Sequence, residues 1–475
     1  MRNMKKLRIL SVILALVTSV VLISVPAGAD SGAVKKLTLS KSVIAVGEYS
    51  NWDGVSNVSQ FLSASGEPYC AYDSGDGYVT VIRTKDGLEL KKKIKLKKTH
   101  PLFGTVISDK DGNYYLVTGE ENKGSVTSKE TVFISKYSSS GKLLATVGDN
   151  GSSSLDYYYD DSFYTKLPFD GGNCDAAIYG DVLAVNYARE MYSGHQSNSL
   201  FAVNINTMEK VSLGVWYNSH SFAQRAMTTK NGFLFVSEGD AYNRAFTVYS
   251  ANMSGNKLSS SNEGDIFHFW VEKSAGDKGN MFVLNDNFAH LGGIVSLPDG
   301  KAALVATSAK SLNKKAADES EELFIQIFDP SKNLSSSSAY VTSGTRSGLS
   351  GINGDQNVTD YGVKWLTAFG DKATVSSPQV VVTDDGKIVV LYERRTKKTV
   401  KMNSGSAYNT TEYSGVYYIV LDKNGKVLQK AKRFSKTAML NPCEMPVCSG
   451  NSIYWFANDN NDSSRSVYLN TLTIK

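Results

Sequence analysis

This 475-residue chain shows little helical periodicity, few prolines and few long apolar runs. It contains only nine prolines, and beyond its first 25 residues no apolar run is long enough to span a membrane. Apolar residues do not recur at the period of an amphipathic helix, which excludes a helical bundle. Gly, Asn, Asp and Ser instead interrupt short runs rich in Tyr and Phe. This texture is typical of one large all-β domain with many short strands.

The first 29 residues have the features of a secretory signal peptide. Basic residues precede an apolar run from Ile9 to Val25, and the small residues 27–29 form a cleavage site. We therefore expect cleavage after Ala29 and a single exported domain over residues 30–475. The expected location is outside a bacterial cell or on its surface, without stable membrane insertion. A retained membrane anchor is the alternative.

Without the signal peptide, the chain also has no excess of positive or negative charge. The chain has 51 basic and 46 acidic residues, and four of the basic ones precede residue 9, which leaves 47 against 46. A protein that binds nucleic acid over its surface is strongly basic. The near-neutral balance therefore excludes nucleic acid as a partner.

The chain contains a repeated unit of four strands. One copy reads FGTVISDKDGNYYLVTG, a loop, then TVFISKYSSSGKLLATV, and a later one reads PQVVVTDDGKIVVLYER, a loop, then GVYYIVLDKNGKVLQKA. Asp-Gly between alternating apolar runs is a strong hairpin signal. Four strands repeated at fewer than 60 residues are typical of a propeller blade.

The repeat predicts a seven-bladed β-propeller. The seven copies begin near Val58, Pro101, Leu167, Ser219, Phe288, Ser376 and Asn441. The last copy has three strand patterns, so we expect residues 36–46 to close the ring as its fourth strand, because an open ring leaves an unpaired edge. Two stretches, 261–287 and 337–374, do not fit the repeat and are expected to be long insertions. Trp365 in the second favours a binding lid over a solvated loop.

Two further patterns have a structural and a functional interpretation. The lysine-rich run LELKKKIKLKKTH at 88–100 fits an exposed outermost strand, where lysine prevents pairing between edges. The alternative is a basic patch for an anionic cell-wall polymer. Asp-rich turns such as SDKDGN lack the twelve-residue pattern of a calcium-binding loop and are interpreted as turns.

Four of the five histidines map to one face of the predicted ring. His100, His220 and His290 stand just before the first strands of their blades, and His195 lies between a second and a third strand. In a propeller these two kinds of loop open on the same face. Imidazoles gathered there suit metal ligation or proton transfer near neutral pH. The simpler interpretation is that polar residues at these positions only line the channel.

Further polar residues are expected on the histidine-bearing face. The predicted ligand-binding set is His195, His220, Gln224, Arg225, Arg189, Asp240, Arg244 and His290. The arginines would recognise a carboxylate or sulfate of an acidic glycan. Metal candidates are His195, His220 and His290, although no spaced metal motif such as HExxH is present and the cofactor is unknown. Tyrosines in LDYYYDDSFY, 155–164, would stack on sugar rings or pack within the connection.

Two of the four cysteines, Cys174 and Cys443, stand at matching positions in the third and seventh copies of the repeat. Export permits disulfides. Cys70 and Cys448 fall in neighbouring first and last blades, and we expect them to form a bridge.

The blade pattern resembles secreted bacterial seven-bladed β-propellers. SHSFAQR and GDAYNR, with GHQSN upstream, are similar to exported clostridial-type proteins without an assigned role. Some propeller polysaccharide lyases hold a metal through His and Gln at the channel mouth. That likeness implies a comparable place for His195, His220, His290 and Gln224, by analogy of fold and not by a motif.

Three functions remain open from the sequence. The first is an exported binding module for a carbohydrate or a cell-surface protein on the histidine-bearing face. The second is a metal-assisted lyase or hydrolase acting on an acidic polysaccharide, which needs clustered imidazoles and an arginine at the channel mouth. The third is a structural component of the cell envelope, which would show a large apolar patch.

Overall fold

A computed structural model describes most of the chain. The described residues are 30–38, 58–124, 126–151, 164–192, 194–239, 245–268, 289–310, 320–334, 337–339, 345–350, 357–401, 407–458 and 466–475. The predicted signal peptide, residues 1–29, lies outside them. Among the described residues, no helix is both long and apolar enough to cross a membrane.

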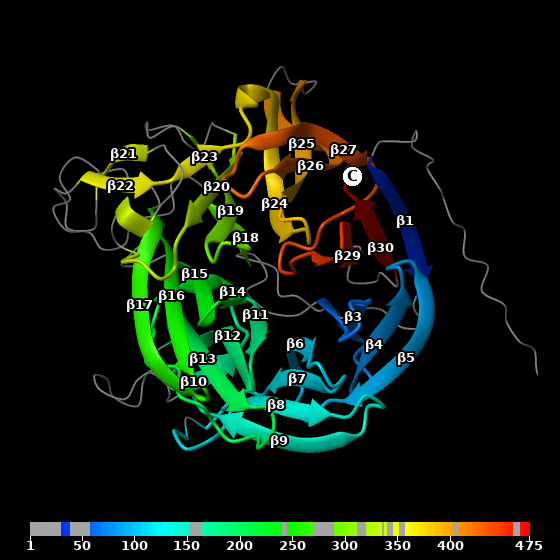
Figure 1. The fold of residues 1–475 in the computed structure, drawn as a ribbon, viewed down its shortest axis with the longest axis vertical. Coiled ribbons are helices and arrows are strands. Elements are labelled where there is room, and N and C mark those ends of the chain that lie inside the picture. The colour runs from blue at the N-terminus through cyan, green and yellow to red at the C-terminus, as the bar shows by residue number, and fades with distance from the viewer. Residues whose placement is uncertain are drawn as a thin grey trace, which may run out of the picture.

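Seven four-stranded antiparallel sheets within the described residues stand around a ring, as Figure 1 shows. The predicted seven-bladed β-propeller is therefore confirmed. In each of blades 1, 2 and 4 the strands run in chain order from the centre to the rim. Blade 1 holds β2 (Val58–Leu62), β3 (Pro68–Asp73), β4 (Tyr78–Lys85) and β5 (Glu89–Lys97). Blade 2 holds β6 (Leu102–Ser108), β7 (Tyr114–Gly119), β8 (Val132–Tyr137) and β9 (Leu143–Asp149). Blade 4 holds β14 (Ser221–Thr229), β15 (Gly232–Gly239), β16 (Ala245–Ser254) and β17 (Lys257–His268).

Blade 3 has an interrupted inner strand. Two short strands, β10 (Thr165–Pro168) and β11 (Cys174–Tyr179), pair with the same neighbour, β12 (Val182–Met191). The next strand is β13 (Gln196–Asn204), and its outer side carries an isolated bridge between Val203 and Lys210.

Blades 5 and 6 complete the ring up to the closing blade. Blade 5 holds β18 (His290–Ser296), β19 (Ala302–Ser308), β20 (Glu322–Phe328) and β23 (Val363–Trp365). Blade 6 holds β24 (Ala373–Val382), β25 (Ile388–Lys401), β26 (Ala407–Leu421) and β27 (Val427–Ser435). A separate hairpin of β21 (Thr345–Ser350) and β22 (Asn357–Tyr361) precedes β23, and two short 3₁₀ turns, η4 (Ser337–Ala339) and η5 (Gly370–Lys372), lie in the connections.

The two ends of the chain close the ring together. Blade 7 has the order β1 (Ser31–Thr38), β30 (Ser466–Thr473), β29 (Ser452–Asn458) and β28 (Val447–Ser449). Closure by an N-terminal strand is thus confirmed, but the expected boundaries 36–46 are wrong. The strand begins at Ser31, opposite Thr473, and ends at Thr38, opposite Ser466. The remainder of the expected strand, 39–46, lies outside the described residues.

The two expected insertions are shorter than the sequence indicated. Residues 261–268 belong to β17, the outer strand of blade 4, and the following residues 269–287 lie outside the described part. Within 337–374, residues 363–365 form β23, the outer strand of blade 5. Trp365 packs edge-on against buried Phe324, with ring centroids 5.2 Å apart. The interpretation of Trp365 as part of a binding lid is therefore wrong, because its ring covers the blade core.

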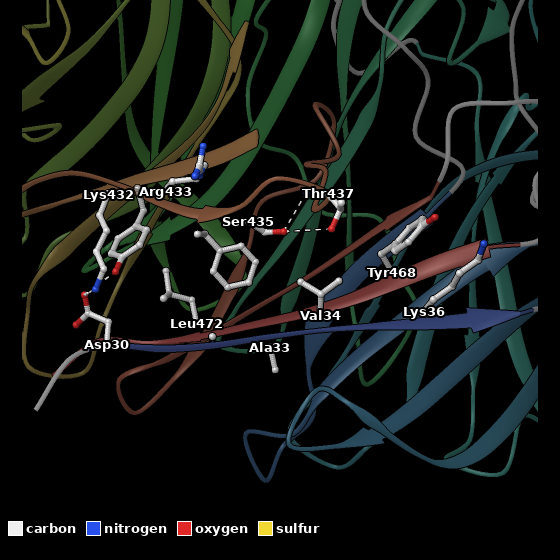
Figure 2. Close-up of a pocket in the computed structure, with 13 residues that line it drawn as sticks. Asp30, Ala33, Val34, Lys36, Lys432, Arg433, Ser435, Thr437, Tyr468 and Leu472 are labelled. Atoms are coloured by element: carbon white, nitrogen blue, oxygen red, sulfur yellow. Dashed lines mark hydrogen bonds and ion pairs between the residues drawn. The ribbon is translucent and has the colours of Figure 1, made fainter. Parts of the chain in front are cut away.

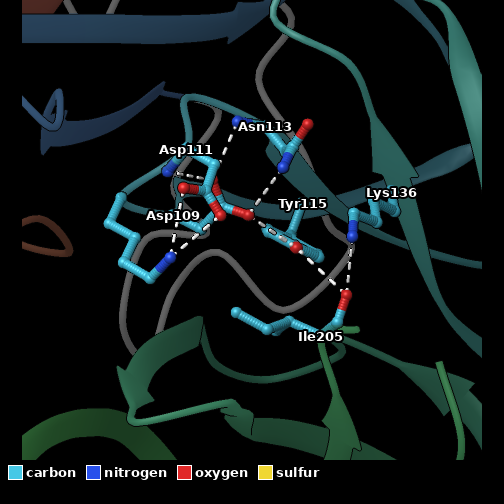
Figure 3. A network of polar contacts seen from close by, with 7 residues as sticks. Asp109, Asp111, Asn113, Tyr115, Lys136 and Ile205 are labelled. Carbon is cyan, nitrogen blue, oxygen red and sulfur yellow. Dashed lines mark hydrogen bonds and ion pairs between the residues drawn. The ribbon is translucent and has the colours of Figure 1, made fainter. Parts of the chain in front are cut away.

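The Asp-Gly turn between β6 and β7 is stabilised by the side chain of Asp109. Figure 3 shows the turn between β6 and β7, where Asp109 Oδ1 accepts hydrogen bonds from the backbone N–H groups of Asp111 and Asn113, each at 2.9 Å. The Tyr115 hydroxyl donates to Asp109 Oδ2 at 2.8 Å, and Lys136 Nζ donates to the Ile205 carbonyl at 2.7 Å. The aspartate is thus engaged within an Asx turn, which agrees with a turn rather than a calcium loop.

The lysine-rich run forms the rim of blade 1. In β5 only Ile94 and Leu96 are buried, and the lysines are exposed. The prediction of an exposed outermost strand is confirmed. The same arrangement recurs in β27, whose exposed residues include Lys432 and Arg433. Cationic side chains on these rim strands discourage pairing with a second sheet edge.

Inner strands of neighbouring blades are joined by buried polar side chains. Asn173, between β10 and β11, donates to the Gln224 carbonyl at 2.9 Å and accepts the Gln224 N–H at 2.6 Å. On the closing side, the backbone N–H of Gln60 donates to Glu444 at 3.1 Å. Hydrogen bonds between inner strands fix the blades around the channel, which sets the positions of the loops above them.

Candidate functional site

The structure places the four predicted histidines at blade loops of one face. His100 precedes β6, His220 precedes β14 and His290 begins β18, whereas His195 lies between β12 and β13. His100 is engaged within its own blade, since its ring stacks on Phe133 with centroids 3.4 Å apart. Its pKa is lowered, mainly by burial. His195, His220 and His290 remain to form a site.

His195 and His220 form a close pair across two blades. Nδ1 of His195 lies 3.4 Å from Nε2 of His220, and the rings meet edge to face with centroids 5.2 Å apart. Nδ1 of His220 in turn lies 3.1 Å from the Ser219 hydroxyl. The chain of polar contacts from Ser219 through His220 therefore orients His195. His195 is exposed, so its Nε2 is the nitrogen left to meet a ligand.

The backbone holds His220 in an unusual conformation. Its φ is +48°, in the left-handed region that non-glycine residues seldom adopt. The neighbouring loop fixes this conformation, because the His220 N–H donates to the Gln196 carbonyl at 2.7 Å and Ser219 forms a bridge with Ser197. Strain of this kind costs about 1–3 kcal/mol and gathers at functional sites. The left-handed backbone conformation turns the imidazole of His220 toward His195.

Tyr192 lies in the same loop as His195, and its hydroxyl donates to the Val126 carbonyl of blade 2 at 3.0 Å. Tyr192 shares a tight turn with His195, in which the N–H of Met191 donates to the His195 carbonyl at 2.9 Å. Tyr164 faces Tyr192 with ring centroids 6.5 Å apart. Tyr164 ends the predicted tyrosine loop, whose residues 155–163 lie outside the described part. Sequence reasoning missed Tyr192, although the run EMYSGHQSN places it three residues before His195.

Blade 4 adds an acid, Glu238, and blade 5 adds a third imidazole, His290. Nδ1 of His290 lies 4.0 Å from Oε1 of Glu238, a buried residue at the end of β15. The other oxygen of Glu238 accepts the N–H of Leu291 at 2.7 Å. Burial raises the pKa of nearby Glu321, against the opposing charges of His290 and Lys397. Glu238 was not among the predicted residues, because one glutamate at a strand end carries no sequence signal.

Arg189 is buried and does not present its guanidinium to a ligand. Its Nε donates to the Ser197 hydroxyl at 2.9 Å, and Nη1 donates to Thr165 Oγ1 at 3.1 Å and to the Gly151 carbonyl at 3.3 Å. Burial lowers its pKa. The predicted role of Arg189 in recognising an anion conflicts with this position, which instead holds the β12–β13 region against the connection before β10.

Arg225 and Gln224 also turn inward. Arg225 is 2% exposed and donates from Nε to Gly292, from Nη1 to Gln224 and from Nη2 to Pro442, each at a carbonyl 2.8 Å away. These bonds run from blade 4 to blade 5 and to the segment before blade 7. The guanidinium therefore spans the space that the inner strands enclose. Gln224 is fully buried and donates to the Ser221 hydroxyl at 2.8 Å, so neither residue reaches the histidine-bearing surface.

The metal candidates do not converge in the described residues. No three His, Cys, Asp or Glu side chains of this part of the chain lie together as ligands. Asp240 and Arg244, the remaining predicted site residues, lie outside the described residues. Of the predicted set, the structure thus brings together His195 and His220, and places His290 on the next blade.

The prediction of a disulfide between Cys70 and Cys448 is wrong. Cys70 and Cys448 are both free thiols. Cys70 packs between blades 7 and 1, whereas Cys448 packs between blades 6 and 7. The two thiols thus lie on opposite sides of the blade 7 sheet. Burial raises the pKa of Cys448 to about 12 and that of Cys70 further, so both remain thiols at neutral pH.

No protein-family model and no curated protein matches the chain. Solved structures to which the chain is similar include a polysaccharide lyase described as an ulvan lyase, with TM-score 0.44 and 7% identity, covering 92% of this chain and 96% of that chain. A protein of unknown function from Dyadobacter fermentans gives TM-score 0.38 and 10% identity over 93% of this chain and 98% of its own. The N-terminal domain of Nup159 gives 0.39 and 10%, covering 95% and 98%. Likeness this distant carries no argument about the site.

Proposed function

We propose that the protein is an exported binding module that takes a carbohydrate on the surface formed by Tyr192, His195 and His220. The observation that carries the proposal is the relay from Ser219 through His220 to His195, built on a strained backbone. It holds one exposed imidazole nitrogen at a fixed position, where it can bind a hydroxyl or a carboxylate oxygen. Export follows from the signal peptide expected over residues 1–29.

Tyr192 and Tyr164 supply the second element that a sugar site needs. Aromatic rings offer an apolar face for stacking on a sugar. Both tyrosines are half-exposed, and Tyr192 belongs to the same turn as His195. The inward position of Arg189 and Arg225 leaves recognition to imidazole and tyrosine side chains among the described residues. Their position favours ligand recognition by hydrogen bonds and ring stacking over recognition of an anion by two arginines.

Binding to a glycan array that includes neutral, uronic-acid and sulfated oligosaccharides tests the proposal. We expect saturable binding to one glycan class, and calorimetry with the best glycan should show His195→Ala weakening affinity about 5- to 30-fold, the loss of one or two hydrogen bonds. Lys110→Ala is the matched control, because Lys110 is an exposed residue of the β6–β7 turn at the opposite ends of the strands. An array without binding, or equal affinities of the wild type and His195→Ala, contradicts the proposal.

A further inference from the structure

A second surface feature lies on the rim, away from the histidine loops. The outer strands of blades 6 and 7, β27 and β1, leave a pocket of about 540 Å³ between them, shown in Figure 2. This volume is within the range of pockets for small ligands. The pocket runs along β1 from Asp30 to Lys36, a span of about 20 Å at roughly 3.3 Å per residue.

The floor and walls of the pocket are mainly apolar. Val34, Phe434 and Leu472 contribute side chains, and Val34 and Phe434 are half-buried extensions of the core between blades 6 and 7. Gly32 permits the position of Phe434, because a Cβ at residue 32 would lie 2.4 Å from Cε2 of that ring. The absence of a side chain at this position therefore keeps the ring against β1 and shapes the apolar wall.

Three of the uncharged polar side chains that line the pocket, Tyr418, Ser435 and Thr437, have partners within the protein. The Ser435 hydroxyl lies 3.3 Å from that of Thr437 and accepts the Thr437 and Ala438 backbone N–H groups at 3.1 and 3.0 Å. The Tyr418 hydroxyl donates to Asp30 at 2.6 Å. These groups are therefore poorly placed to recognise a polar ligand such as a sugar.

The charged groups of the pocket are mostly cationic. Lys432 and Arg433 stand at one end and Lys36 at the other, whereas Asp30 is the single acid of the lining. Asp30 is already engaged, since Lys432 Nζ lies 3.6 Å from it. Among the described residues, neither Lys36 nor Arg433 has a carboxylate within ion-pair distance. An apolar groove with cations at its ends is complementary to an apolar chain that carries an anionic group.

We propose that this pocket binds a single-chain anionic amphiphile, a molecule of the fatty-acid class. Its aliphatic chain would lie on Val34, Phe434 and Leu472, and its anionic group would pair with Lys36 or Arg433. A membrane surface fits less well, because elements that bind membranes present their apolar side chains outward, whereas those of this pocket line a recess. The proposal is independent of the carbohydrate site.

Calorimetry with three twelve-carbon amphiphiles below their micellar concentrations tests the proposal. Dodecanoate, dodecanol and dodecyltrimethylammonium share one chain and differ in the charge of the head group. We expect dodecanoate to bind at one site per chain, at least 10-fold more tightly than the other two. Equal affinities for the three amphiphiles, or no binding of dodecanoate, would overturn the proposal. So would binding to phosphatidylglycerol vesicles without binding of monomeric dodecanoate.

Variants locate the site. Val34→Glu places a carboxylate on the apolar wall and should weaken dodecanoate binding at least 10-fold. Leu428→Glu is the matched control on β27, because Leu428 is 54% exposed and does not line the pocket; its affinity should equal that of the wild type. The double variant Lys36→Gln with Arg433→Gln leaves the strands intact and should weaken dodecanoate binding about 5- to 10-fold. This variant tests the location of the site if Val34→Glu fails to fold. Unchanged affinity in that double variant would overturn the proposal.

Discussion

Replacing Arg225 with methionine is expected to lower the free energy of unfolding by about 3–5 kcal/mol. The change leaves the carbonyls of Gly292, Gln224 and Pro442 without their buried donor, and each unsatisfied buried polar group costs about 1–3 kcal/mol. Arg225→Lys should also destabilise, because an ammonium group cannot reproduce the fork that reaches the three carbonyls. Urea denaturation followed by tryptophan fluorescence measures the effect.

The same variant should show a particular dependence on pH. Burial raises the pKa of Asp175, which the charge of Arg225 opposes. Without that charge, the pKa of Asp175 in the folded variant rises further above the ordinary Asp value of about 4. The variant therefore loses folding free energy as pH increases from about 4 through this raised folded pKa, because the folded state resists ionisation of Asp175. The deficit should therefore be larger at pH 7 than at pH 4. Arg433→Met, at an exposed arginine of β27, should change stability by less than about 0.5 kcal/mol; an equal effect of the two changes would contradict the role assigned to Arg225.

Removing residues 30–38 should produce an aggregating protein that is at least about 4 kcal/mol less stable. The deletion removes β1 and exposes the edge of β30, which pairs with it from Ser466 to Thr473. Several ladder hydrogen bonds, each contributing about 1 kcal/mol, are lost with it. Light scattering and thermal unfolding of the shortened chain measure both effects. A synthetic peptide of residues 30–38 should restore solubility by adding the missing strand; a shortened chain as stable and monomeric as the full one would show that β1 does not close the ring.

Asp30→Asn weakens the same closure more gently and in a pH-dependent way. Burial alone would raise the pKa of Asp30, but hydrogen bonds from Tyr418 and the Lys475 N–H, with the charge of Lys432, lower it overall. The carboxylate therefore stabilises the fold above its unfolded pKa of about 3.9, and this contribution is lost as pH falls through the lower folded value. We expect a difference of about 0.5–1 kcal/mol at pH 7, after screening by water, that disappears below pH 3.

The blade architecture could be predicted because its signals are local. A glycine turn joins the first two strands in each unit, as Asp-Gly in blades 2, 5 and 6. The first strands begin close to the predicted positions, as at Val58 and at Leu102. The closing strand was misplaced because β1 lies at the rim, where SGAVKKLT carries little apolar alternation. Trp365 was misassigned because a three-residue outer strand leaves no periodic pattern.

The face of the candidate site could be predicted, but not which side chains reach its surface. Loop position alone placed His195 and His220 on one face, and the structure joins them. Alternation along the strand after His220 could not show that Gln224 and Arg225 point into the ring, because that depends on the bulge between Ser221 and Ala223 and on neighbouring blades. Arg189 was misjudged for a related reason, since its partners Gly151 and Thr165 are far from it in sequence.

We propose that the His195–His220 pair contacts the glycan ligand directly. The most direct test is a heteronuclear spectrum of the protein with isotope-labelled histidine, which contains only five such residues, during titration with the best glycan from the array. We predict that the resonances of His195 and His220 shift together and saturably, while that of His100, stacked on Phe133, stays in place. Unshifted resonances of His195 and His220 at saturating glycan would contradict the claim.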